Sequence, residues 1–213
     1  MSGTGPSSVS TSTDRAPSSP AARKDAQPPA RAAAPRSVDP RASWIAHRMN
    51  EMPKYVMFLY NLLLDANIDW RFKEHAFGTL RYIFEEDGII PDDDPLLGRL
   101  DDLAFTFRCF AELIGSLPEG KLAIYEQVLA AYAIPIRQYV AEAPQWLGDF
   151  YFAVATLYPQ TITRLCDKLG NAIKTGELVR ALQHYLETFK PDDPNSAKME
   201  RCVVFLDNYK LGR

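Results

Sequence analysis

Apolar residues recur every three or four positions through most of residues 44–213, and alternating β-branched residues are scarce there. This spacing places apolar side chains along one face of an α-helix. The clearest stripe lies in residues 95–115 and consists of Leu96, Leu100, Leu103, Phe107, Phe110 and Ile114. The pattern predicts an all-α fold, a compact bundle of about seven to eight helices.

Proline and glycine divide this region into separate helices. We expect helices over residues 44–66, 70–87, 95–115, 119–142, 145–158, 160–175, 177–189 and 195–208. Pro53 and Pro135 fall inside two of these, where a missing N–H and a clash with the preceding turn kink or split a helix. The helices over 70–87 and 95–115 are apolar on two sides, so we expect them at the centre of the bundle.

Residues 1–43 have a different composition. They hold seven of the sixteen prolines and no Leu, Ile, Phe, Tyr or Trp. Such a segment cannot offset the cost of ordering its backbone, about 1–2 kcal/mol per residue. We therefore expect a disordered tail over 1–43, with net charge +3, and one helical domain over 44–213, with net charge −6.

Charge and hydropathy narrow the class of protein. Lys and Arg number 24 against 27 Asp and Glu, which gives no basic surface for nucleic acid. No window reaches the roughly 18 uncharged apolar residues of a transmembrane helix, although peripheral membrane contact stays open. Cys109, Cys166 and Cys202 are far apart, which indicates reduced thiols in a cytoplasmic protein.

The segment 82–107, YIFEEDGIIPDDDPLLGRLDDLAFTF, is rich in carboxylates. Its acidic residues are Glu85, Glu86, Asp87, Asp92, Asp93, Asp94, Asp101 and Asp102. Asp94 before Pro95 is typical of a helix N-cap followed by proline in the first turn. Asp101 and Asp102 lie one to two turns further on, where the helix dipole no longer stabilises them. Those two carboxylates need solvent, a cation or buried hydrogen-bond donors.

This segment resembles the YkvA-like family, also called domain of unknown function 1232. The matching residues are Tyr82, Asp87, Ile90, Pro91, Asp92, Pro95, Leu97, Gly98, Asp101, Asp102 and Leu103. The chain departs from the family at Glu85 and Glu86, where a small residue and proline are common, and at Asp93 and Asp94, where the family is usually apolar. The resemblance implies a helical hairpin around the turn and no named reaction, because the family has no agreed activity.

Two hypotheses account for the acidic turn. The first is a divalent-cation site for Mg²⁺ or Mn²⁺, formed by Asp87, Asp92, Asp101 and Asp102. It would make the chain a metal-dependent enzyme. The second is a hydrogen-bonded corner, whose carboxylates accept backbone N–H groups and pair with Arg81 or Arg99. We favour the corner. The chain contains no HExxH, GxSxG or complete phosphate-loop motif, which argues against catalytic function in general.

Four aromatic residues recur at seven-residue intervals: Tyr125, Tyr132, Tyr139 and Trp146. They would form either a groove for a partner helix or core packing with hydroxyl groups at the surface. Taken together, these features predict a non-enzymatic adaptor or regulatory protein with a protein partner and no cofactor. The alternatives are the metal-dependent enzyme and a peripheral membrane protein.

Overall fold

The computed structural model describes residues 39–85, 89–90, 95–131, 133–167, 176–193 and 196–210. Within these ranges the chain forms helices and no strand, which confirms the predicted all-α fold. The helices are α1 (Pro40–Asn50), α2 (Met52–Leu64), α3 (Trp70–Phe84), α4 (Pro95–Ser116), α5 (Glu119–Ala131), α6 (Ile136–Leu147), α7 (Asp149–Cys166), α9 (Glu177–Thr188) and α10 (Ala197–Asn208). The predicted disorder of the tail falls on residues 1–38, which lie outside the described ranges.

The first helix begins earlier than the sequence pattern predicted. Pro40 opens α1, and the carboxylate of Asp39 accepts the N–H of Arg41 at 2.7 Å as an N-cap. Ala42 is buried in the core. The predicted helix start at residue 44 was therefore wrong, because the pattern relied on large apolar side chains and missed a capped start that lacks them.

The two prolines expected to interrupt helices do so. α1 and α2 are separate helices that meet at Glu51, two residues before Pro53. The expected helix over 119–142 is divided into α5 and α6, with Ala133 at φ 58° and Pro135 just before α6. Both breaks follow from the missing N–H of proline and its clash with the preceding turn.

The breaks expected before residues 145 and 160 were wrong. α6 continues through Pro144, and α7 continues through Pro159. The chain turns instead at Gly148, whose φ of 59° and ψ of −141° suit glycine alone. α7 remains one helix across Pro159 because Tyr158 and Ile162, on either side of it, are both buried in the core.

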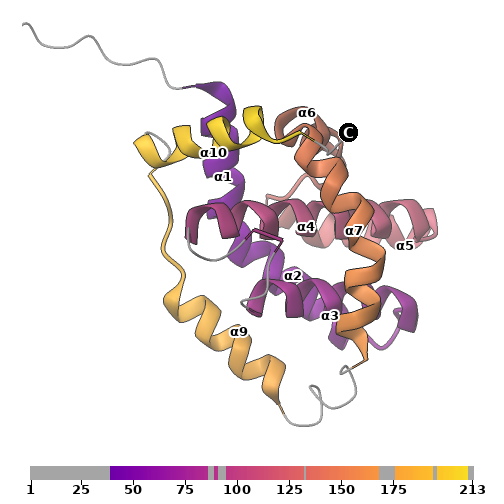
Figure 1. Ribbon diagram of the computed structural model, residues 1–213. Coiled ribbons are helices and arrows are strands. Elements are labelled where there is room, and N and C mark those ends of the chain that lie inside the picture. The colour runs from indigo at the N-terminus through magenta and orange to yellow at the C-terminus, as the bar shows by residue number, and fades with distance from the viewer. Residues whose placement is uncertain are drawn as a thin grey trace, which may run out of the picture. The chain divides into compact units, whose positions relative to one another are not determined.

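α3 and α4 occupy the centre of the bundle, as their two apolar faces predicted. α3 packs against α2, α4 and α7, and α4 also packs against α1, α6 and α10. Figure 1 shows α4 crossing the middle of the bundle, α10 running above it and α9 lying at the lower left edge. A Cβ at Gly78 would lie 2.6 Å from Cδ1 of Ile162, so this glycine permits the close approach of α3 and α7.

No helix in the described ranges combines the length and apolar character that crossing a bilayer requires.

Candidate functional site

The described residues of the acidic segment contribute to a buried corner between α3 and α4. Asp101 on α4 is 1% exposed, and its Oδ2 accepts the hydroxyl of Tyr82 at 2.8 Å and the N–H of Ile90 at 2.9 Å. The Tyr82 hydroxyl in turn accepts the N–H of Ile89 at 2.7 Å. Two consecutive backbone N–H groups after α3 are thus held by one tyrosine and one carboxylate.

Burial dominates the electrostatics of this corner. It raises the pKa of Asp101 to about 6, although the hydrogen bonds from Ile90 and Tyr82 act in the opposite direction. Burial and the neighbouring Asp101 carboxylate raise the pKa of Tyr82, so its hydroxyl remains a donor. The Tyr82 ring is stacked on Phe105 with centroids 3.9 Å apart, which fixes the direction of that hydroxyl.

The other residues of the predicted turn lie in different surroundings. Pro95 begins α4, and Gly98 is buried within it. Asp102 is half-buried. The pKa of Tyr185 on α9 is raised first by the burial of Tyr185 and second by the negative charge of Asp102. The remaining three predicted residues, Asp87, Pro91 and Asp92, lie outside the described ranges.

The two arginines that were expected to pair with the acidic segment, Arg81 and Arg99, have different partners. Arg81 forms ion pairs with Glu85, which belongs to the acidic segment, and with Glu177 on α9 at 2.5 Å. Arg99 pairs instead with Asp192, far along the chain from the acidic segment, at 2.8 Å. The sequence pattern could not show these long-range partners.

The described residues lend no support to a cation centre. Nowhere in the described ranges do three or more His, Cys, Asp or Glu side chains converge as metal ligands would. The Oδ2 atom of Asp101 already accepts two hydrogen bonds from the protein. In its described residues, the polar groups of the corner bond to one another and connect α3 to α4.

The aromatic repeat does not lie on one helix. Tyr125 belongs to α5, Tyr139 and Trp146 belong to α6, and Tyr132 lies outside the described ranges. The Tyr139 ring is buried, with the guanidinium of Arg48 3.8 Å from its centroid. α5 ends before α6 begins, so the regular seven-residue spacing does not continue along one helix.

Two further aromatic contacts complete this picture. The Trp146 ring stacks on Trp44 of α1 with centroids 5.9 Å apart. The hydroxyl of Tyr125 donates to Asp65 at 2.5 Å, just after the end of α2. All three described members of the repeat thus contact other parts of the same chain.

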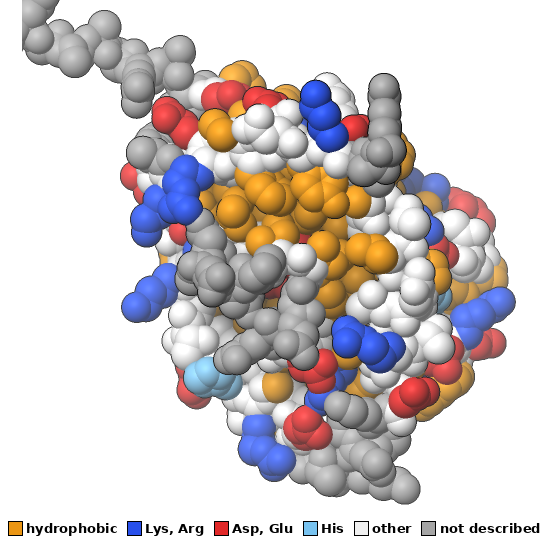
Figure 2. Space-filling view, viewed as in Figure 1, with side chains coloured by type: hydrophobic (Ala, Val, Ile, Leu, Met, Phe, Trp, Pro, Cys, Tyr) orange, Lys and Arg blue, Asp and Glu red, His pale blue; other side chains and the backbone are white. Residues whose placement is uncertain are grey.

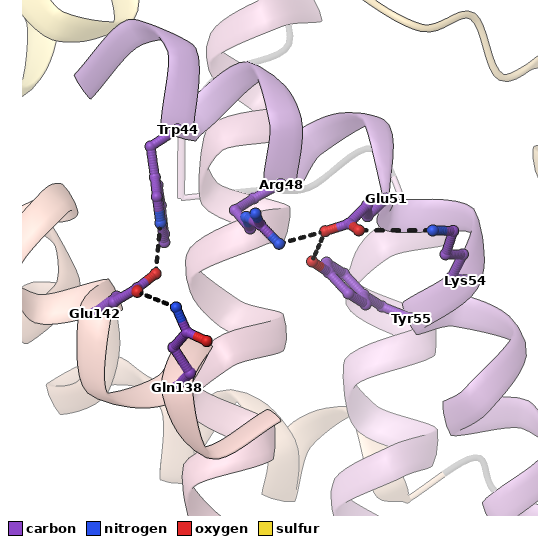
Figure 3. A network of polar contacts seen from close by, with 7 residues as sticks. All are labelled: Trp44, Arg48, Glu51, Lys54, Tyr55, Gln138 and Glu142. Carbon is purple, nitrogen blue, oxygen red and sulfur yellow. Dashed lines mark hydrogen bonds and ion pairs between the residues drawn. The ribbon is translucent and has the colours of Figure 1, made fainter. Parts of the chain in front are cut away.

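A polar network joins α1, α2 and α6 beside these rings (Figure 3). Glu51 accepts hydrogen bonds from Arg48 at 2.6 Å and from Tyr55 at 2.9 Å, and Lys54 lies 3.5 Å from it. Sequence reasoning missed this network, although the spacing of three and four residues around Glu51 is a helical ion-pair signal.

A second group of polar contacts joins α1 to α6. The indole N–H of Trp44 donates to Glu142 at 2.8 Å, and the amide of Gln138 donates to the other oxygen at 2.7 Å. These contacts are all within the chain, so they hold α1 against α2 and α6.

An apolar groove lies between α4 and α10. It has a volume of about 400 Å³ and is lined by Leu97, Glu200, Arg201, Val204, Phe205 and Asn208. Val204 is 58% exposed. The Phe205 ring packs against Phe150 of α7, with ring centroids 5.6 Å apart. Figure 2 shows hydrophobic side chains gathered in a patch below α10. The signal in the sequence was the run 202–206, CVVFL, which is too long for one helix face.

A second hollow, of about 630 Å³, lies at the turn between α5 and α6. Its lining includes the small residues Ala130 and Ala133, and the ion pair of Arg137 with Glu126 crosses it. Ile134 and Ile136, its large apolar side chains, are buried in the core. This hollow therefore offers fewer apolar anchors than the α4–α10 groove.

No protein-family model matches the chain, and neither a curated protein nor a solved structure matches it. The resemblance of residues 82–107 to the YkvA-like family stays a prediction.

Proposed function

We propose that this chain is a non-enzymatic interaction protein that binds an amphipathic helix of a protein partner in the α4–α10 groove. The observation that carries the proposal is the exposed side chain of Val204, next to the half-buried Leu97 and Phe205. Contiguous apolar surface of this kind favours burial by about 25 cal/mol per Å² and marks interaction sites.

The shape and borders of the groove favour a helix as its occupant. Two helices, α4 and α10, line it, and Glu200 and Arg201 bring charges of both signs to its border. An amphipathic helix buries its apolar face between such helices and keeps its polar face at the rim. The overall net charge of −3 argues against nucleic acid as the partner.

The composition of the N-terminal residues favours an occupant from another chain. Residues 1–38 contain no Leu, Ile, Phe, Tyr or Trp, so they supply no large apolar anchor for this groove. We further propose that the protein acts in the cytoplasm, because Cys109, Cys166 and Cys202 form no disulfide with one another.

The test places a photo-crosslinking amino acid at Val204 and, as a matched control, at Val128, an exposed valine on α5. A discrete adduct is expected from position 204 and not from position 128. Adding Leu97→Lys, which puts a charge in the groove, should abolish the adduct while the circular dichroism spectrum stays the same. Adducts of equal yield at both positions, or an adduct that survives Leu97→Lys, would overturn the proposal.

A further inference from the structure

α9 is attached to the bundle through a small core contact. Along its whole length it fully buries only Leu178 and Leu182, whereas α3 buries side chains on most of its turns. Val179 and Leu186, which lie seven residues and thus about two turns apart on the same face, remain 39% and 38% exposed. The apolar stripe of α9 is therefore wider than the surface that covers it.

Side chains from both halves of α9 contact the C-terminal end of α3. Glu177, half of whose side chain is exposed, pairs with the buried Arg81 at 2.5 Å. The Tyr185 ring packs on Phe84 with centroids 5.6 Å apart. Arg81 also pairs with Glu85 on its own side of the contact, so it keeps one carboxylate partner when Glu177 is removed.

The segment after α9 is anchored more firmly than α9 itself. Asp192 and Asn50 exchange two hydrogen bonds, at 2.7 and 2.8 Å, between backbone and side-chain amide. Arg99 binds the carboxylate of Asp192 and donates to the carbonyl of Lys190 at 2.9 Å. These bonds fix residues 190–192 to α1 and α4, and so give α9 a fixed pivot at its C-terminal end.

We propose that α9 is a latch that undocks from α3 as a unit while the other helices stay folded. Its release breaks the Arg81–Glu177 ion pair and uncovers Phe84, at the end of the helix that carries Tyr82 of the acidic corner. Local opening of this kind belongs to elements with few buried apolar contacts, and the anchored segment 190–192 lets α9 return to the same place. The inference does not depend on what binds the α4–α10 groove.

Native-state hydrogen exchange on the full chain tests the latch. Peptides that cover α9 are compared with peptides from α3 and α7 at low concentrations of denaturant. We expect α9 amides to be protected, but to exchange about tenfold or more faster than those of α3, with little dependence on denaturant. Equal exchange rates and equal denaturant dependence in α9 and α3 would overturn the latch, because the two helices would then open together. Unprotected α9 amides would also overturn it, because α9 would then not be docked.

Two variants change the contacts from opposite sides. Glu177→Gln removes the ion pair from α9, and Phe84→Leu removes the aromatic contact from α3. Each should speed exchange in α9 about threefold or more while α4 and α7 are unchanged. Glu187→Gln, at an exposed position of the same helix, is the matched control and should leave the exchange rate of α9 close to that of the parent. Equal effects of Glu177→Gln and Glu187→Gln would overturn the role of the ion pair and with it the latch.

Discussion

The hydroxyl of Tyr82 on α3 donates a hydrogen bond of 2.8 Å to Oδ2 of Asp101 on α4. Asp101 is almost completely buried, and a buried carboxylate is costly unless donors surround it. The Tyr82 hydroxyl and the N–H of Ile90 are those donors, and the N–H of Ile89 completes the set by donating to Tyr82. The corner is therefore a closed arrangement in which each member depends on the others.

The phenol of Tyr82 should be the most sensitive part of this corner. Tyr82→Phe leaves the N–H of Ile89 without its acceptor and removes one donor from Asp101. We expect the free energy of unfolding to fall by about 1–3 kcal/mol in urea denaturation. Tyr60→Phe, at a half-buried tyrosine on α2, is the control and should change it by less than about 0.5 kcal/mol. Equal losses in the two variants would contradict the special role of Tyr82.

Asp101 should make stability depend on pH in the weakly acidic range. Its pKa in the folded protein, about 6, is raised above the ordinary value of 3.8, so the folded state binds the proton more tightly than the unfolded state does. Its contribution to stability is fully present below about pH 4 and is lost as the pH rises through about 6.

The measurement compares the free energy of unfolding of the parent protein with that of Asp101→Asn from pH 4 to pH 7. Relative to the variant, the parent should lose about 2–3 kcal/mol across this interval. His75, whose pKa is lowered mainly by burial, is present in both proteins, so its titration cancels in the difference. Parallel curves for the two proteins would show that Asp101 does not titrate in this range.

Gly148 and Gly115 should respond in opposite directions to the same substitution. At Gly148 the backbone between α6 and α7 has a φ of 59°, so Gly148→Ala should destabilise the fold by about 1–3 kcal/mol. Gly115 lies within α4 with nothing near its Cβ position, so Gly115→Ala should stabilise it by about 0.5–1 kcal/mol. Thermal unfolding gives both values, and shifts of the same sign would contradict the assigned backbone conformations.

The Glu51 network should show strong coupling. Glu51→Gln weakens the partner of Arg48, which has a mostly buried side chain, and should cost about 2–3 kcal/mol of unfolding free energy. In a double-mutant cycle, Arg48→Met should remove much of that penalty, because the unpaired charge is no longer present. If the losses of unfolding free energy in the two single variants add up in the double variant, Arg48 and Glu51 are not energetically coupled. Glu119→Gln, which breaks a solvent-exposed pair with Arg137, is the control and should leave stability unchanged.

Local patterns were enough to predict much of the secondary structure, and less of the site. The apolar spacing predicted α3 and α4 as central helices, and Pro53 and Pro135 marked real breaks because the missing N–H acts locally. Pro159 was misread, since burial of Tyr158 and Ile162 carries α7 past it. The partner of Arg99 is Asp192, 93 positions away, which no local spacing reveals.

The sequence alone determined that this protein is helical and that residues 82–107 concentrate carboxylates at a turn, because helical periodicity and turn chemistry operate over a few residues. Tertiary structure decided what those features do. It buried Asp101 against Tyr82, dispersed Tyr125, Tyr139 and Trp146 over two helices, and left Val204 exposed beside α4. Burial depends on which distant helices cover a side chain, and that is a property of the packed bundle.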